Sequence, residues 1–441
     1  MFKKKVTTWI VVLVLFSLLE FLMLSYLKGY FGIYFSPVIF FISSAGVSIS
    51  ALYAAFFFKE TPVINQKYIR SILLMLPLLI GLLYYGYSVF SQFPVDSNQS
   101  DVFAQVLSPS TWLLTGEYPY QDVVLPTYTM HNTYLPMQWL PFILAVIFSI
   151  DPRWIPLTAW VIMMIFFLYF LPVSQRKWDF KFTAGYFLTG VLAIFSMYGF
   201  ISENSFDYAV TLEMLPVAYY IGLTLSLLRG NWFFMGLSMG CCLMSRFSIL
   251  LFVPFLMWYV WKRFGSAVFL KSCVTTVVFI ILIFILPFML KDPQLVSKIA
   301  GNYENGAFGE WQVHGWQQDG EEPYQLARGL GAAIFFKRLY EYDIESGIQH
   351  IKEVGTLLSG IIAIFMIYLY QRNRKFLNHD WVLLGGVKLY LTIFYTFVLI
   401  PYPYLYVLPV TMTSLMILKA YSDYSRFEIR DPNVPLCIEA S

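Results

Sequence analysis

Long apolar stretches recur along the whole chain, and few charged residues interrupt them. Of the 441 residues, 59% are hydrophobic and 12% are charged, whereas about 25% are charged in an ordinary soluble domain. A helix of about 20 apolar residues crosses the hydrocarbon core of a bilayer. The composition therefore excludes a soluble enzyme, a disordered protein and a disulfide scaffold, and it predicts an all-α polytopic membrane protein.

About 12 stretches are long enough to cross the membrane. We expect a single transmembrane domain over residues 1–420 and a tail at 421–441. The expected crossings lie near residues 6–27, 35–58, 71–91, 155–173, 183–200, 211–228, 232–245, 247–262, 267–289, 354–370, 381–400 and 404–420. The 232–245 stretch is short, so a tilted or broken helix is expected there.

Lysine and arginine are concentrated in alternate loops, and this distribution sets the orientation. With the N-terminus in the cytoplasm, the loops on that side contain 19 of the 29 basic residues and 7 of the 26 acidic residues. The outer loops then contain 9 basic and 18 acidic residues. We therefore expect an integral protein of the bacterial inner membrane, with both termini in the cytoplasm.

The outer side is expected to carry two long loops, residues 92–133 and 290–353, and one partial helix. Residues 134–150 are apolar enough to cross, but a crossing there would place the basic segment 174–181 outside. Two prolines and a length of about 17 residues favour a re-entrant helix instead. Long loops on one face indicate that recognition or chemistry takes place at that face.

The first outer loop contains an ordered pattern of residues. Asp101 follows a crossing and begins an apolar-periodic stretch, residues 116–120 read Gly-Glu-Tyr-Pro-Tyr, and Tyr134-Leu-Pro136 begins the next helix. This pattern resembles the first lumenal loop of the type-C (GT-C) glycosyltransferases, and is most similar to the bacterial polyprenyl-phosphate-mannose-dependent mannosyltransferases. The motif match is local to this loop, and the layout of spans extends it weakly over most of the chain. The resemblance implies a GT-C-like helical bundle.

The resemblance also implies roles for individual residues. Asp101 corresponds to the catalytic aspartate, and Asp96 is the alternative. Tyr134 falls where the next helix begins and is expected to bind substrate. Arg246 stands where related enzymes often have a lysine, so it keeps the positive charge and adds a forked contact for phosphate. The family often has a tyrosine shortly after its aspartate, whereas this chain has Val102 or Phe103 at that position. This departure bears on how the substrate is positioned.

Transfer of a sugar from a lipid phosphate to an alcohol requires two kinds of group. A base takes the proton of the acceptor, and positive charge stabilises the departing phosphate. The displacement would invert the anomeric centre. Further phosphate partners are expected among Arg328, Lys337 and Arg338. Glu203 and Asp207 are expected to hold acceptor hydroxyls or to share a divalent metal with Asp101.

Plainer interpretations of the same residues stay open. Asp101 is also a candidate helix cap, residues 203–207 a solvated loop, and Arg246 a charge that reaches out of the membrane. His131 fits a surface hydrogen bond as well as a substrate contact. His314, next to Trp311 and Trp316 in the second outer loop, is the better candidate for a polar substrate contact.

Other charged residues have weaker interpretations. A charge-rich run is expected to be a solvated loop: Glu304, Glu310, Asp319, Glu321 and Glu322. Glu20 and Lys388 lie within expected crossings, and Glu20 has no evident partner.

The function that these patterns favour is transfer of a hexose, such as mannose, from a polyprenyl-phosphate carrier to a lipid-linked or glycan acceptor at the outer face. Membrane lipids are expected partners and nucleic acid is not. No cofactor is indicated, and a divalent metal stays open. Two alternatives remain: a flippase or transporter of lipid-linked glycans, and a polysaccharide polymerase or ligase, which would rely on His314 and Arg328.

Overall fold

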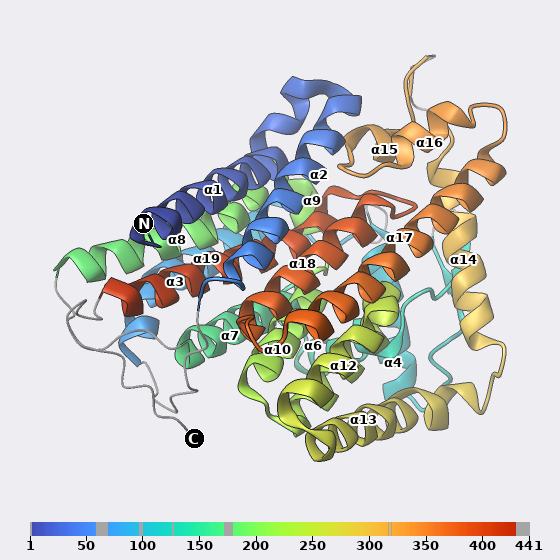
Figure 1. Cartoon of the computed structure of the whole chain (residues 1–441). Helices are drawn as coiled ribbons and strands as arrows, with labels where there is room; N and C mark the ends of the chain where they lie inside the picture. Colours follow the sequence, from blue (N-terminus) through green and yellow to red (C-terminus); the bar gives the residue numbers. More distant parts are fainter. Residues whose placement is uncertain are drawn as a thin grey trace.

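The computed structural model describes residues 2–58, 69–96, 100–125, 128–171, 180–315, 317–318 and 320–428. About 80% of them are helical, and strands are nearly absent (Figure 1). Seven described helices are long and apolar enough to cross a membrane: Val6–Ala54, Ser71–Gln92, Thr183–Glu203, Phe247–Phe264, Ser266–Met289, Ile344–Asn373 and Pro403–Tyr424. Four shorter apolar helices accompany them: Pro136–Phe148, Trp154–Phe170, Met214–Arg229 and Trp232–Ser245. The all-α membrane architecture is therefore confirmed, and the number of crossings stays a prediction.

The elements follow one another as a series of helices with one small hairpin. The first half contains α1 (Phe2–Leu22), α2 (Lys28–Ala54), α3 (Ile69–Gln92), α4 (Asp101–Leu114), β1 (Asp122–Val124), β2 (Thr129–His131), α5 (Pro136–Trp139), α6 (Ile143–Phe148), α7 (Trp154–Phe170), α8 (Phe180–Glu203), α9 (Ser205–Ala209) and α10 (Met214–Arg229). The second half contains α11 (Trp232–Ser245), α12 (Val253–Phe264), α13 (Ser266–Ile280), α14 (Leu295–Glu310), α15 (Tyr324–Arg328), α16 (Ala333–Leu339), α17 (Ile344–Asn373), α18 (His379–Thr396) and α19 (Val407–Glu428). Segments of π-helix continue α1 (Met23–Leu27) and α13 (Ile281–Met289), and 3₁₀ turns occupy Leu140–Phe142, Phe247–Phe252 and Pro403–Tyr406.

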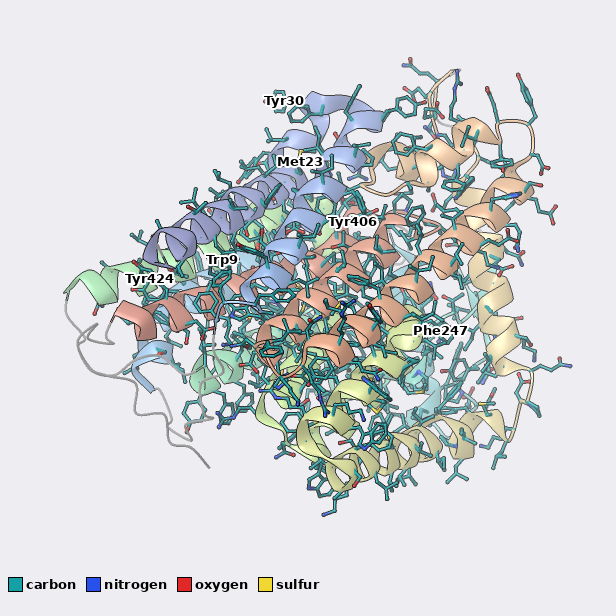
Figure 2. The ribbon with its side chains drawn as sticks, in the orientation of Figure 1. Trp9, Met23, Tyr30, Phe247, Tyr406 and Tyr424 are labelled. Atoms are coloured by element: carbon teal, nitrogen blue, oxygen red, sulfur yellow. The ribbon has the colours of Figure 1, made fainter. Side chains whose placement is uncertain are left out.

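The long N-terminal helical stretch is a hairpin. Gly32 has φ +73° and ψ 173°, a conformation that glycine adopts without the steric cost that a Cβ brings. The Trp9 indole nitrogen donates to the Ser50 carbonyl at 2.7 Å, so the start of α1 lies beside the end of α2. Figure 2 shows Trp9 and Tyr30 at opposite ends of this pair of helices. Two antiparallel segments follow, as expected for residues 6–27 and 35–58.

Described residues from the two expected sets of loops lie at opposite ends of the bundle. At one end the Trp9 ring packs against Trp381 at 5.3 Å, and Arg263 pairs with Asp380 at 2.8 Å. At the other end Lys28 donates to Asn204 at 2.7 Å. In Figure 1, α1 begins on the left and α14, α15 and α16 lie on the right. The assignment of the first end to the cytoplasm stays a prediction, and most of the basic loops 59–70 and 174–182 lies outside the described residues.

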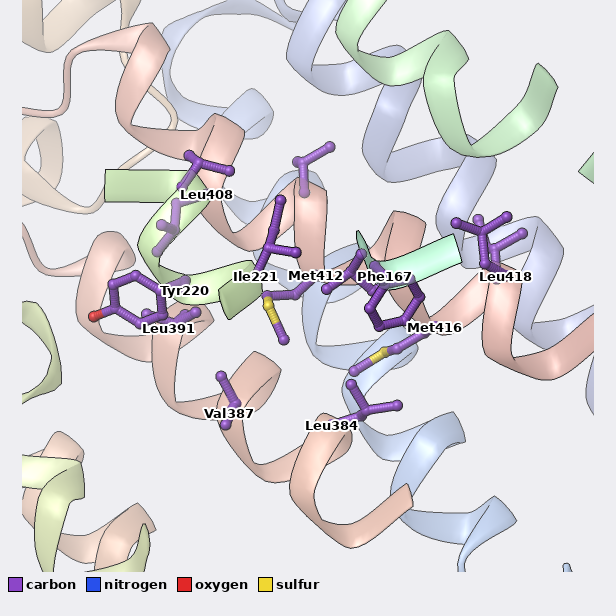
Figure 3. Close-up of a cluster of buried hydrophobic side chains, with 14 of the residues drawn as sticks. Phe167, Tyr220, Ile221, Leu384, Val387, Leu391, Leu408, Met412, Met416 and Leu418 are labelled. Carbon is purple, nitrogen blue, oxygen red and sulfur yellow. The ribbon is translucent and has the colours of Figure 1, made fainter. Parts of the chain in front are cut away.

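The centre of the bundle is apolar and formed mainly by the last two helices. In the most apolar window of Pro403–Tyr424, 94% of the residues are buried, against 11% in Ser266–Met289. The C-terminal helix is therefore central, and α13 is peripheral. Figure 3 shows the contact region, to which α7, α10, α18 and α19 contribute Phe167, Tyr220, Ile221, Leu384, Val387, Leu391, Leu408, Met412, Met416 and Leu418.

One ion pair is buried inside this apolar centre. Lys388 of α18 pairs with Glu20 of α1, and both side chains are 0% exposed. Lys388 also donates to the Pro409 carbonyl at 2.8 Å, and the Thr413 hydroxyl donates to Glu20 at 2.6 Å. Glu20, which had no evident partner from sequence alone, is thus held by groups of two other helices.

The segment after the first outer loop is short and broken. It comprises α5, a 3₁₀ turn and α6, and belongs to the apolar helices of 10–17 residues. At 1.5 Å per residue this is about 25 Å at most, less than the hydrocarbon core of about 30 Å. After it, Arg153 donates to the carbonyls of Phe93 and Ala209, which lie at the outer end. The re-entrant course of this segment stays a prediction.

Both expected outer loops contain regular structure. Residues 92–133 include α4 and the β1–β2 hairpin, and residues 290–353 include α14, α15 and α16. The expected tail begins later than position 421, because α19 continues to Glu428. Trp316 and Asp319 of the second loop lie outside the described residues.

Candidate active site at the outer end

Asp101 is the first residue of α4, and another residue caps that helix. The Ser100 side chain accepts from the Val102 amide at 3.3 Å, which makes Ser100 the N-cap. The Asp101 carboxylate instead accepts from the Gln105 side-chain amide at 3.2 Å. Asp101 is therefore not the N-cap, although it still lies in the first turn, where the helix dipole favours negative charge.

Burial raises the pKa of the Asp101 carboxyl, because removal from water penalises its charged form. Hydrogen bonds from the Tyr128 hydroxyl and from Gln105 oppose this effect, and the nearby Glu310 carboxylate adds to it. A raised pKa makes the ionised carboxylate a better proton acceptor near neutral pH.

The Gln105 amide is held in one orientation. The Thr133 hydroxyl donates to its Oε1 atom at 2.7 Å, so its nitrogen faces Asp101. The side chain of Asn132, which is fully buried, donates to the Gln105 backbone carbonyl at 3.1 Å. This network connects the start of α4 to the strand that leads into α5, and it positions the carboxylate.

Arg246 lies in an extended turn between α11 and the following 3₁₀ segment, with φ −149° and ψ 146°. Its guanidinium pairs with Glu213, which precedes α10. The Nε atom is buried and has no hydrogen-bond partner among the described residues. One donor of this arginine is therefore left unused, which is uncommon for a buried polar atom.

A cavity of about 320 Å³ opens beside Arg246. It lies between the start of α5, the turn at Arg246, α14, α17 and the end of α18. One part of its wall is apolar and includes Leu135, Phe247, Leu251, Ile299, Phe394, Phe397, Val398 and Leu399. Phe247 is labelled in Figure 2, on the side of the bundle that faces α14.

The remaining wall of the cavity is polar. Glu304 and Lys352 form an ion pair there. Gln138 Oε1 and Ser359 Oγ are buried in the wall without a partner among the described residues, as is Arg246 Nε. Three such atoms belong to residues that line this cavity together with apolar side chains, a combination that suits a ligand with a polar head and an apolar tail.

Tyr134 connects the cavity to Asp101. It lines the cavity and interacts electrostatically with Asp101 as well as with Arg246. The Tyr120 hydroxyl donates to the Tyr134 carbonyl at 3.1 Å and accepts from the Trp139 indole at 3.2 Å. Of the three residues that the sequence pattern singled out, Tyr134 and Arg246 line the cavity, and Asp101 does not line it but interacts electrostatically with Tyr134.

Asp207 and Arg328 bind each other instead of lining this cavity. Their side chains are 2.5 Å apart, and Arg328 also donates to the Tyr324 hydroxyl at 2.7 Å. Glu203 is exposed at the end of α8 and does not line the cavity. Within the described residues, no group of three or more His, Cys, Asp or Glu side chains is arranged to hold a metal.

The other candidate residues lie around the rim. His131 contacts Asp122 across the hairpin at 3.0 Å, and His314 contacts Glu310 at 3.4 Å. The Asp96 carbonyl accepts from the Ser100 amide at 3.2 Å, one turn before α4. The exposed side chains of Lys337 and Arg338 contact Glu341. None of these residues lines the 320 Å³ cavity.

Two acidic residues of the site were missed from sequence. Glu310 was expected in a solvated loop, but it ends α14, accepts from the Tyr402 hydroxyl at 3.1 Å and repels Asp101. Glu213 neutralises Arg246. A single acid at the start of an apolar helix needs a partner, and that signal points to Glu213.

Comparisons with protein-family models, with curated proteins and with solved structures find no match to this chain. The function must therefore be argued from the site itself.

Proposed function

We propose that this protein is an integral-membrane glycosyltransferase that moves a hexose from a polyprenyl-phosphate carrier to an acceptor alcohol at the outer face. One observation carries the proposal: a carboxylate whose pKa is raised interacts electrostatically with Tyr134, which lines a cavity that also contains an arginine with an unused donor. The local resemblance of residues 100–141 to GT-C enzymes supports the same assignment.

In the proposed reaction the donor lies in the 320 Å³ cavity. Its hydrocarbon chain contacts the apolar wall near Leu251 and Phe394, and its phosphate accepts hydrogen bonds from Arg246. Asp101 takes the proton of the acceptor hydroxyl as that oxygen attacks the anomeric carbon. The bond between the anomeric carbon and the phosphate oxygen breaks, the lipid phosphate leaves with the bonding electrons, and the anomeric centre is inverted.

The test is a transfer assay with the full-length protein in phospholipid nanodiscs. The donors are radiolabelled polyprenyl-phosphate mannose and glucose, and the acceptor is a membrane-lipid extract. Loss of a general base costs roughly 10² to 10⁴ in rate, so Asp101→Asn is expected to lower transfer by that factor. Asp96→Asn, the same change one turn before α4, is expected to retain the wild-type rate.

Each outcome decides between explanations. Wild-type turnover in Asp101→Asn contradicts the assignment of the base, and loss of turnover in Asp96→Asn alone moves that role to Asp96. If the wild type binds the donor but transfers no label to any acceptor, the glycosyltransferase proposal fails. A lipid-flipping assay in vesicles then tests the transporter alternative, which the amphipathic cavity also suits.

A further inference from the structure

A second cavity of about 560 Å³ lies between the β1–β2 hairpin and α14. The region before and within the hairpin contributes Tyr120, Gln121, Asp122 and His131, and α14 contributes Lys298, Gly301, Asn302 and Asn305. Nothing in the mechanism proposed above uses this cavity.

The two cavities share α14 as a wall. Positions 298, 301, 302 and 305 follow the spacing of a single helical face, and they line the second cavity. Positions 299, 300, 303 and 304 line the first cavity. The face that lines the second cavity carries amides and a glycine, and the face that lines the first cavity carries Ile299 and Tyr303. One helix therefore separates an amphipathic compartment from a polar one.

The chemistry of the second cavity suits a neutral, hydroxyl-rich ligand. Side-chain amides of Asn302 and Asn305 offer both donors and acceptors. Gln121 offers its side-chain carbonyl, because its amide nitrogen donates to the Tyr118 carbonyl at 2.8 Å. The cation in the wall is already neutralised, since Lys298 pairs with Asp292 at 2.6 Å. Asp122 adds a negative charge. This balance disfavours a phosphate group and favours sugar hydroxyls, which donate to carboxylates and amides.

His131 adds an acceptor to the wall. Its Nδ1 atom contacts the Asp122 carboxylate at 3.0 Å, so in the neutral ring Nδ1 carries the hydrogen and Nε2 keeps a lone pair. The Nε2 atom has no hydrogen-bond partner among the described residues. A ligand hydroxyl would complete this set of hydrogen bonds.

The second cavity is connected to the proposed base through a short chain of contacts. His131 is followed by Asn132 and Thr133, and both hydrogen-bond to Gln105. Gln105 in turn donates to Asp101. A ligand held at His131 therefore lies beside the segment that positions the carboxylate.

We infer that the second cavity binds neutral sugar units of the acceptor glycan and so presents the acceptor hydroxyl to the site. The identification of this sugar as the acceptor rests on the proposed function. The binding of neutral sugars is argued from the cavity alone.

The experiment blocks the second cavity and measures sugar binding. A Cβ at Gly301 meets nothing within 4 Å, and neither does one at Gly306, which lines neither cavity. Gly301→Trp therefore introduces a bulky ring at an open position of the cavity wall, and Gly306→Trp is the matched control on the same helix. Saturation-transfer NMR on the full-length protein in nanodiscs uses mannotriose, maltotriose and chitotriose as probes, with inorganic phosphate as competitor.

At least one trisaccharide is expected to bind the wild type, with a Kd raised by about tenfold or more in Gly301→Trp, which corresponds to about 1.4 kcal/mol. Gly306→Trp and Asp101→Asn are expected to bind like the wild type, and phosphate is expected not to compete. Absence of binding by the wild type, equal binding by Gly301→Trp, or displacement by phosphate would overturn the inference.

If the trisaccharide binds as expected but the wild type never transfers label, the proposed reaction fails and the sugar site stands. If transfer occurs and Gly301→Trp does not alter it, the acceptor site fails and the reaction stands.

Discussion

Removal of one partner of the buried ion pair between α1 and α18 is expected to destabilise the protein strongly. Lys388→Met keeps the length and volume of the side chain but leaves the Glu20 carboxylate buried, with the Thr413 hydroxyl as its remaining described donor. Because both side chains of the pair are 0% exposed, no water replaces the lost ammonium group. Breaking such a pair typically costs about 3–5 kcal/mol.

The double variant separates the strength of the pair from the cost of an orphaned charge. In Glu20→Leu with Lys388→Met both charges are absent, and the Thr413 hydroxyl is free to donate to the Pro409 carbonyl that Lys388 contacted. Replacement of a buried pair by apolar residues is often neutral or stabilising. We therefore expect the double variant to lie within about 1 kcal/mol of the wild type.

The assay is reversible unfolding in mixed micelles, with SDS titrated into dodecylmaltoside and helicity followed by circular dichroism. Lys352→Met is the matched control, because Lys352 pairs with Glu304 where both side chains are 36–48% exposed, and exposed pairs contribute about 0–1 kcal/mol. Two results would refute the reasoning: a Lys388→Met variant no less stable than Lys352→Met, or a double variant that is less stable than Lys388→Met.

The remaining predictions concern the site and the N-terminal hairpin. Because Asp101 must be ionised to act, Glu310→Gln, which removes a repulsion, should lower the pKa of Asp101 and move the acid limb of the kcat/KM profile to lower pH. Gln105→Leu, which removes a stabilising hydrogen bond, should move the same limb to higher pH; a shift of both in one direction contradicts the assignment. Arg246→Lys keeps the charge but loses the forked donors, so transfer should fall by about tenfold or more in kcat/KM with little change in the unfolding midpoint. Gly32→Ala should cost about 1–2 kcal/mol in the SDS titration, since φ is +73° while its Cβ would meet nothing within 4 Å.

Local patterns along the chain predicted much of the fold. Apolar stretches placed the helices, and the charge distribution grouped the loops into the two sets that the structure gathers at opposite ends. The segment 134–150 was expected to re-enter the membrane because a crossing there would place the basic segment 174–181 outside, and its helices are short. Asp101 and Tyr134 were singled out by the resemblance of the first outer loop to GT-C enzymes, and Arg246 by the same resemblance and by the charge that it places in an apolar stretch.

The pairings were not predictable from such patterns, because they join distant parts of the chain. Glu20 and Lys388 are 368 positions apart, and only the packing of α1 against α18 brings them together. For the same reason Asp207 and Arg328 looked like separate ligands of substrate, although each neutralises the other. Glu310 resembled its solvated neighbours because a charged run carries no sign of which members contact the rest of the protein.

Two arginines, the buried Arg153 and the partly exposed Arg246, show how a structure separates a structural cation from a candidate for ligand binding. Arg153 uses its guanidinium on the Asp151 carboxylate and on the carbonyls of Phe90 and Phe93, and its plane lies 4.6 Å from the Phe90 ring centre. These hydrogen bonds connect the end of α3 to the segment that follows α6. A ligand could bind the Arg153 guanidinium only by displacing them. Arg246 pairs with one carboxylate, leaves its Nε atom unused and faces a cavity. Because a buried unused donor is costly, the structure tolerates it most readily where a ligand supplies the acceptor, and a lipid phosphate is such an acceptor.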